Sequence, residues 1–194
     1  MKIAILGWGS LIWNPGNLEI EKTQEQNGWF DDGPMMPIEF ARISKNKRLT
    51  LVIVPGSEEV RTLYAISKFE ILDEAILDLA VREGCGKNKV GFFDKKKGEF
   101  YPPKFEHKNN IKDWINDKED VDAVIWTDLA NNFKDKVRLE LTADNVINYL
   151  EDLLDDVKAL SEQYIRRAPV AVNTPFRKEI EKKLGWSPIK GDLS

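Results

Sequence analysis

Short apolar runs, separated by glycine, proline and charged turns, predict several strands in the first two thirds of the chain. The first strand is expected at residues 2–6, because residues 3–6 form an apolar run unbroken by polar residues, which is typical of a strand buried on both faces. The polar stretch 14–37 contains Gly and Pro and predicts a long connection. Further runs rich in β-branched or aromatic residues predict strands at 38–43, 49–54, 60–66, 90–93, 99–101 and 121–127.

Two other segments have the three- and four-residue spacing of apolar positions that is expected of helices. The first spans 68–83 and is stopped by Gly84 and Gly86. The second follows Thr142, a favourable N-cap residue, and a last helix is expected from Thr174. The second helix is predicted to be long, with an apolar stripe at Val146, Ile147, Leu150, Leu153, Leu154, Val157 and Leu160.

The order of these elements indicates the fold class. Strands come in clusters rather than in strict alternation with helices, which favours an α+β mixed sheet or barrel over a doubly wound sheet. We find no internal repeat, low-complexity block or linker in the 194 residues. We therefore expect a single domain over 1–194, with a frayed tail from about residue 187.

Charge and composition exclude several function classes. The net charge of −4 gives no electrostatic reason to expect a nucleic-acid partner, and the basic clusters at 45–48 and 94–97 are expected to be solvated hairpin tips. No apolar segment is long enough to span a membrane. One cysteine and one histidine exclude an intrachain disulfide, a thiolate cluster and a site with two imidazoles, so we expect no metal and a cytoplasmic location.

The first apolar run ends in two glycines on either side of an aromatic residue. Residues 7–13 read Gly-Trp-Gly-Ser-Leu-Ile-Trp. The glycines allow a tight turn and the approach of a ligand to bare main chain, and amides that point together can hold a carboxylate or carbonyl oxygen. A dinucleotide-binding fingerprint is disfavoured because Ile12 stands where its third glycine would be.

A candidate acid/base residue, Glu83, lies at the end of the first predicted helix. At 100° per residue it returns to within about 20° of Leu72, on the apolar stripe. Partial burial and the negative helix end would both disfavour its charged form, which suits a group that takes up a proton near neutral pH. The alternative is a structural glutamate that bends out to water or pairs with Arg82 or Lys87.

Together, the two motifs resemble the γ-glutamylcyclotransferase superfamily. Residues 7–13 follow the glycine loop of its ChaC branch, with Trp8 in place of the usual Tyr. Residues 79–93 resemble the stretch in which a catalytic glutamate at a helix end precedes glycine and an aromatic strand. The resemblance covers roughly residues 3–93, including two intervening segments that look like an uncharacterised bacterial branch, at 33–44 and 48–52.

This resemblance implies a mixed sheet or small barrel with flanking helices and a reaction that needs no cofactor. In the family, the α-amine of a γ-glutamyl amide or peptide attacks its own γ-carbonyl, which gives 5-oxoproline and a free amine. The resemblance assigns Glu83 as the general acid/base. It assigns substrate binding to Gly7, Trp8, Gly9, Ser10, Leu11 and Ile12.

Other roles and other functions stay open. Arg42, on a predicted strand, is a candidate anion anchor, but it could equally pair with Glu39 or project outward. The alternative to an enzyme is a non-catalytic ligand-binding or interaction domain that keeps the glycine loop. The leaving amine and the oligomeric state are undecided. For four candidate pocket residues, core packing is favoured: Tyr64, Tyr101, Tyr164 and Asn173.

Overall fold

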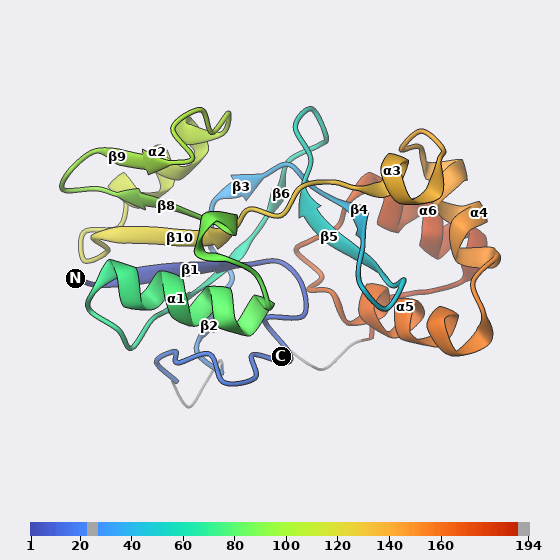
Figure 1. Ribbon diagram of the computed structural model, residues 1–194, viewed down its shortest axis with the longest axis horizontal. Helices are drawn as coiled ribbons and strands as arrows, with labels where there is room; N and C mark the ends of the chain where they lie inside the picture. Colours follow the sequence, from blue (N-terminus) through green and yellow to red (C-terminus); the bar gives the residue numbers. More distant parts are fainter. Residues whose placement is uncertain (23–26, 190–194) are drawn as a thin grey trace. The chain divides into compact units, whose positions relative to one another are not determined.

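The computed structural model describes residues 1–22 and 27–189 (Figure 1). The chain forms two compact units, each assembled from three segments. Unit 1 comprises Met1–Gly7, Asn14–Met36 and Arg61–Leu129; unit 2 comprises Trp8–Trp13, Pro37–Val60 and Ala130–Ser194. The expected α+β class is confirmed, whereas the single domain stays a prediction. Most of the tail that was expected to fray lies outside the described residues.

A six-stranded mixed sheet forms the centre of unit 1. Its order is β2 (Trp29–Phe30), β7 (Leu63–Ile66), β1 (Ile3–Gly7), β10 (Ala123–Thr127), β8 (Val90–Asp94) and β9 (Glu99–Tyr101). β1 and β10 are parallel, and the other neighbours are antiparallel. Among the described residues β2 and β9 do not pair with each other, so this is a mixed sheet and not a closed barrel.

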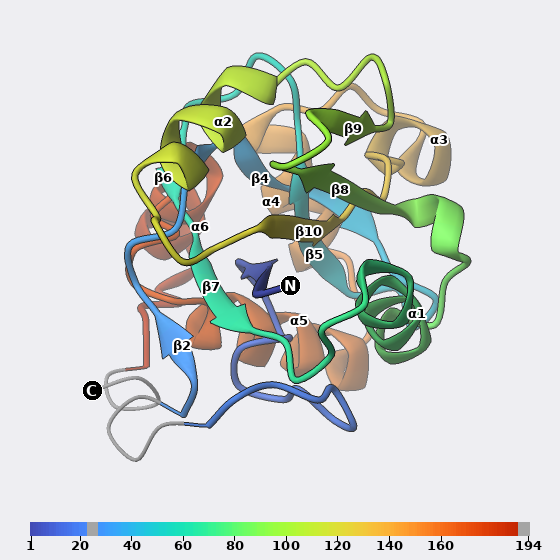
Figure 2. The same cartoon turned by 90° about the vertical axis from the view of Figure 1, so that its left-hand side faces the viewer.

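Helices cover both faces of this sheet. Figure 2 shows α1 (Leu72–Glu83) on one face and α2 (Lys108–Asn116) on the other. α1 begins four residues later than expected and ends as expected at Gly84, which has a φ of 61°. Only glycine adopts this left-handed conformation at little cost. A short 3₁₀ turn, η1 (Lys87–Lys89), then leads into β8.

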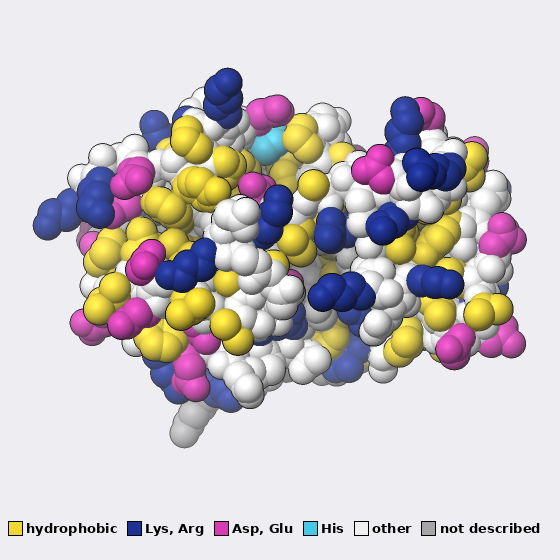
Figure 3. All heavy atoms as spheres, in the orientation of Figure 1, with side chains coloured by type: hydrophobic (Ala, Val, Ile, Leu, Met, Phe, Trp, Pro, Cys, Tyr) yellow, Lys and Arg dark blue, Asp and Glu magenta, His cyan; other side chains and the backbone are white. Residues whose placement is uncertain are grey.

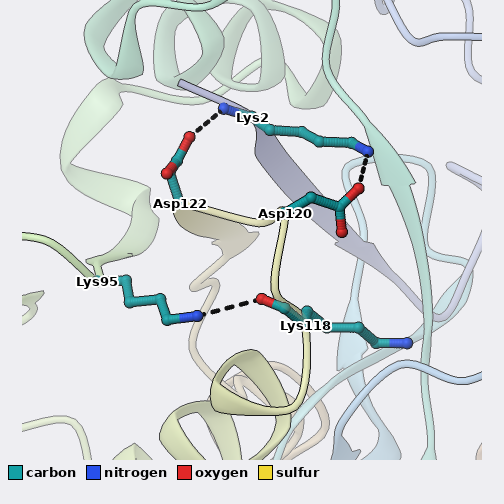
Figure 4. A network of polar contacts seen from close by, with 5 residues as sticks. All are labelled: Lys2, Lys95, Lys118, Asp120 and Asp122. Carbon is teal, nitrogen blue, oxygen red and sulfur yellow. Dashed lines mark hydrogen bonds and ion pairs between the residues drawn. The ribbon is translucent and has the colours of Figure 1, made fainter.

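Polar contacts at the amino ends of β1 and β10 hold the two parallel strands in register (Figure 4). The backbone amide of Lys2 donates to Asp122 at 2.7 Å, and its Nζ pairs with Asp120 at 2.5 Å. Nearby, Lys95 Nζ donates to the carbonyl of Lys118 at 3.1 Å. Because β1 and β10 run in parallel, their carboxyl ends lie together at the opposite edge of the sheet from these contacts.

Unit 2 is built on the antiparallel hairpin of β4 (Ile38–Ile43) and β5 (Leu49–Ile53), with the basic cluster 45–48 at its tip as expected. Its helices are α3 (Phe133–Val137), α4 (Ala143–Glu151), α5 (Asp155–Arg167) and α6 (Pro175–Leu184).

The remaining short strands, β3 (Met35–Met36) and β6 (Val60–Arg61), form a separate two-stranded sheet. No helix in the described part of the chain is long and apolar enough to cross a membrane.

The prediction of one long helix after Thr142 is wrong, because the structure has two helices there, α4 and α5. Thr142 does cap α4, and its hydroxyl accepts from the amide of Asn145 at 3.3 Å. The break comes at Leu154, whose side chain is 72% exposed and whose ψ of 147° is extended. Asp155 and Asp156 follow in the first turn of α5, where negative charge favours the start of a helix.

Candidate functional site

Glu83, the candidate acid/base residue, is the last residue of α1 in unit 1. Its carboxylate is paired with the guanidinium of Arg82, with 2.7 Å between Nη1 and Oε1. The side chain of Glu83 is 18% exposed and that of Arg82 is 13% exposed. The structure therefore shows the ion pair with Arg82 that the sequence left open. At this degree of burial each charge offsets part of the desolvation cost of the other.

The same helix face holds the segment that follows the glycine turn. Arg82 also donates from Nη2 to the carbonyl of Asn14 at 2.5 Å. One turn earlier, Asp78 accepts from the amide of Glu19 at 2.9 Å. Burial raises the pKa of Asp78, and this hydrogen bond opposes the shift. The contacts fix the chain after the turn to the end of α1 that carries Glu83.

The carboxyl ends of β1 and β10 lie at the same edge of unit 1 as the end of α1 (Figure 1). Gly7, the last residue of β1, pairs with Leu63 of β7. Asp128 directly follows β10, and its amide donates to the carbonyl of Lys89 at 2.8 Å. Burial raises the pKa of Asp128, and the charge of Lys89 opposes this. Ligands of α/β sheets bind outside the carboxyl ends of parallel strands, so this edge suits a binding site.

The glycine turn belongs to unit 2 from Trp8 onwards. The amide of Ile12 donates to the carbonyl of Gly9 at 3.0 Å, which closes the tight turn that the sequence predicts. Trp8, Leu11 and Ile12 are buried, whereas Ser10 is half-buried. Because the Ile12 amide is used within the turn, it is not available to hold a ligand oxygen.

Tyr164 of α5 packs directly on Gly9. A Cβ atom at Gly9 would lie 2.3 Å from the Tyr164 hydroxyl oxygen, so a side chain does not fit there. The same hydroxyl accepts from the amide of Leu51 in β5 at 3.4 Å. Core packing is the role that the sequence favours for Tyr164, and nothing in the sequence links this residue to the turn. Since these residues are far apart along the chain, no local pattern could have done so.

Two arginines lie over the aromatic rings beside the turn. The guanidinium of Arg48 is 4.8 Å from the ring centre of Tyr164, and that of Arg167 is 5.9 Å from the ring centre of Trp13. The rings of Trp13 and Tyr164 meet edge to face, with 5.3 Å between their centres. Figure 3 shows Lys and Arg side chains gathered over the β4–β5 hairpin and α3. This part of unit 2 is locally positive in a chain of net negative charge.

Arg42, the candidate anion anchor, donates from Nη1 to the carbonyl of Ala130 at 2.6 Å. Glu39, one of the partners considered for it, is instead 2% exposed and accepts from Thr174 and from two backbone amides, those of Phe40 and Phe176. Burial raises the pKa of Glu39, and these hydrogen bonds oppose the shift. Glu39 thus ties β4 to the start of α6, which is a structural role.

The other candidate pocket residues differ in their surroundings. Tyr64 is buried in unit 1 and stacks on Phe30, with 4.9 Å between ring centres. Tyr101 stacks on Phe92 at 5.9 Å, and Asn173 is exposed. Across residues 1–22 and 27–189, no group of three His, Cys, Asp or Glu side chains could hold a metal ion.

The candidate residues are divided between the two units. Gly7 and Glu83 belong to unit 1, whereas Trp8, Gly9, Ser10, Leu11, Ile12 and Arg42 belong to unit 2. No family model matches the chain, and no curated protein or solved structure has significant similarity to it. The substrate-binding and catalytic roles therefore stay predictions from the sequence motifs and the local geometry.

Proposed function

We propose that the protein is a γ-glutamylcyclotransferase that converts a γ-glutamyl amide or peptide to 5-oxoproline and a free amine. The observation that carries the proposal is the position of Glu83. Its carboxylate is largely buried at the end of α1, on the edge of unit 1 from which the chain enters the glycine turn. A carboxylate that is mostly buried at the carboxyl edge of a sheet is more typical of a catalytic site than of a solvated surface.

The proposed reaction is intramolecular and requires no cofactor. The α-amine of the substrate loses a proton to Glu83 and forms a bond to the γ-carbonyl carbon. The bond between that carbon and the leaving nitrogen then breaks, and Glu83 returns the proton to the leaving amine. The protein has to hold the substrate in a folded conformation and move one proton, which are tasks for positioning groups and a single acid/base.

Arg82 has a positioning role in this proposal. Its Nη1 engages Oε1 of Glu83 and its Nη2 engages the carbonyl of Asn14, so the carboxylate has a fixed orientation. Within the described part of the chain, Oε2 of Glu83 makes no hydrogen bond or ion pair. We assign proton transfer to this second oxygen.

The test is mass-spectrometric detection of 5-oxoproline after incubation with glutathione, other γ-glutamyl peptides and γ-glutamylamines. Glu83→Gln removes the acid/base group with almost no change in shape and should lower kcat by about 10²- to 10⁴-fold. The matched control is Glu74→Gln, which changes an exposed glutamate of the same helix and should leave kcat unaltered. Unaltered turnover by Glu83→Gln, or no 5-oxoproline from any substrate, would contradict the proposal.

The Arg82–Glu83 ion pair also supports a second candidate function, a non-catalytic domain that binds small γ-glutamyl ligands. In that case the pair only fastens the end of α1 to Asn14. Binding of γ-glutamyl compounds without 5-oxoproline formation, together with a loss of stability in Glu83→Gln, would favour this alternative.

A further inference from the structure

Arg48 of unit 2 has a buried polar side-chain atom, Nε, that no contact within the described residues satisfies. Its backbone is fixed at the hairpin tip, where its amide donates to the hydroxyl of Ser44 at 3.1 Å. Its side chain is folded back over the ring of Tyr164, and its Nε is buried with no hydrogen-bond partner among the described residues. A solvated hairpin arginine would instead keep these donors in water.

The guanidinium carbon of Arg48 lies over the ring of Tyr164, and its Nε makes no hydrogen bond within the described residues. Stacking on an aromatic ring leaves the N–H groups in the plane of the guanidinium, directed away from the ring. A buried donor without an acceptor costs free energy, so such a group is usually completed by a ligand or water. Arg177 differs at its terminal nitrogens, because Nη1 and Nη2 donate to three backbone carbonyls, although its Nε is likewise buried without a partner among the described residues.

Tyr164 connects this arginine to the glycine turn within unit 2. The hydroxyl group of Tyr164 packs on Gly9, and the guanidinium of Arg48 lies over the ring of the same tyrosine. An acceptor bound by Arg48 therefore lies about one aromatic ring away from the turn. Trp13, which packs edge-on against Tyr164, carries the second guanidinium, that of Arg167.

We propose that Arg48 binds the carboxylate of a small acidic ligand beside the Gly9–Ile12 turn. The planar fork of a guanidinium matches a carboxylate in a two-point hydrogen bond, which is the geometry left unused at Arg48. The identification of this carboxylate as the α-carboxylate of a γ-glutamyl amide rests on the proposed function. Arg48, and not Arg42, is then the anion anchor, since Arg42 already donates to Ala130.

The first experiment measures binding without turnover. Glutaramate keeps the carboxylate and the γ-amide of glutamine but lacks the α-amine that would attack, so it cannot cyclise. It is titrated into protein labelled with ¹⁵N-arginine while the Nε–Hε resonances are followed. Butyramide, which lacks the carboxylate, is the matched ligand. The Arg48 resonance is assigned by its absence from Arg48→Lys, and glutaramate should shift it whereas butyramide should not.

Variants then test the role of the side chain. Arg48→Met keeps the length of the side chain and removes the charge, and it should weaken glutaramate binding by roughly 10- to 100-fold, the loss expected for charge-assisted hydrogen bonds. Arg48→Lys keeps the charge but loses the fork, so it should bind with intermediate affinity. Lys45→Met removes an exposed charge from the same hairpin tip and should bind as the wild type does.

The outcomes separate this inference from the proposed function. Equal glutaramate affinity in wild type and Arg48→Met, or no shift of the Arg48 resonance at saturating glutaramate, overturns the anion site. Formation of 5-oxoproline with an unchanged KM in Arg48→Met also overturns it, while the proposed function stands. Glutaramate binding through Arg48 in a protein that forms no 5-oxoproline supports the site and contradicts the proposed function.

Discussion

The packing of Tyr164 on Gly9 gives a prediction that can be worked out in detail. In Gly9→Ala the new methyl group would lie 2.3 Å from the Tyr164 hydroxyl oxygen, so the ring has to move by about 1 Å to restore ordinary contact. Tyr164 is 5% exposed and packs against Trp13 and Phe40, which leaves little room for this movement. We expect Gly9→Ala to lower the free energy of unfolding by about 1–3 kcal/mol, as overpacked cores do.

A second substitution isolates the cause. Tyr164→Phe removes the hydroxyl, after which the nearest ring atom, Cζ, would be 3.3 Å from the new methyl group. This substitution alone should cost about 1 kcal/mol, because the amide of Leu51 loses its acceptor. In the Tyr164→Phe background, Gly9→Ala should cost less than about 1 kcal/mol, so the double-mutant cycle should show a coupling of about 1 kcal/mol or more.

Urea unfolding followed by tryptophan fluorescence measures these differences as shifts of the midpoint at constant m value. Gly86→Ala is the matched control, because the nearest atom to its new methyl group is the end of the flexible Asn88 side chain. That variant should change the free energy of unfolding by no more than about 0.5 kcal/mol. The reasoning is refuted if Gly9→Ala is as mild as Gly86→Ala, or equally costly with and without the Tyr164 hydroxyl.

Two further predictions concern buried polar groups of unit 2. Because burial raises the pKa of Glu39 above its ordinary value near 4.5, the stability of the wild type relative to Glu39→Gln should increase as the pH falls from 7 towards 4.5; urea titrations at several pH values test this, and the opposite slope would contradict it. Arg177→Met should lower the free energy of unfolding by about 2–4 kcal/mol, measured in the same way, because it leaves three buried carbonyls without their donor: those of Ala168, Pro169 and Val172. An Arg177→Met protein as stable as the wild type would show that this side chain contributes nothing net.

Local sequence pattern predicted much of the sheet. The strands at 38–43 and 99–101 have the predicted bounds, Gly84 and Thr142 act as the predicted helix stop and helix cap, and the last helix begins after Thr174 as expected. These features depend on side chains within a few residues of each other, because alternation, burial of a run and capping are local effects. The same reasoning failed at Leu154, where apolar spacing continued across a break between two helices.

The candidate site also has features that the local sequence predicts and features that it does not. The sequence by itself identified the turn at residues 7–13 and a glutamate at a helix end, since both are short motifs. Only the tertiary structure decided that Arg82 pairs with Glu83 and holds Asn14, and that Tyr164 fills the space at Gly9. The tertiary structure also decided the place of Arg48. Its charge was expected at a solvated hairpin tip, and it lies over the buried ring of Tyr164. Contacts between distant segments depend on how helices and strands pack, and a single chain's local pattern does not encode that packing.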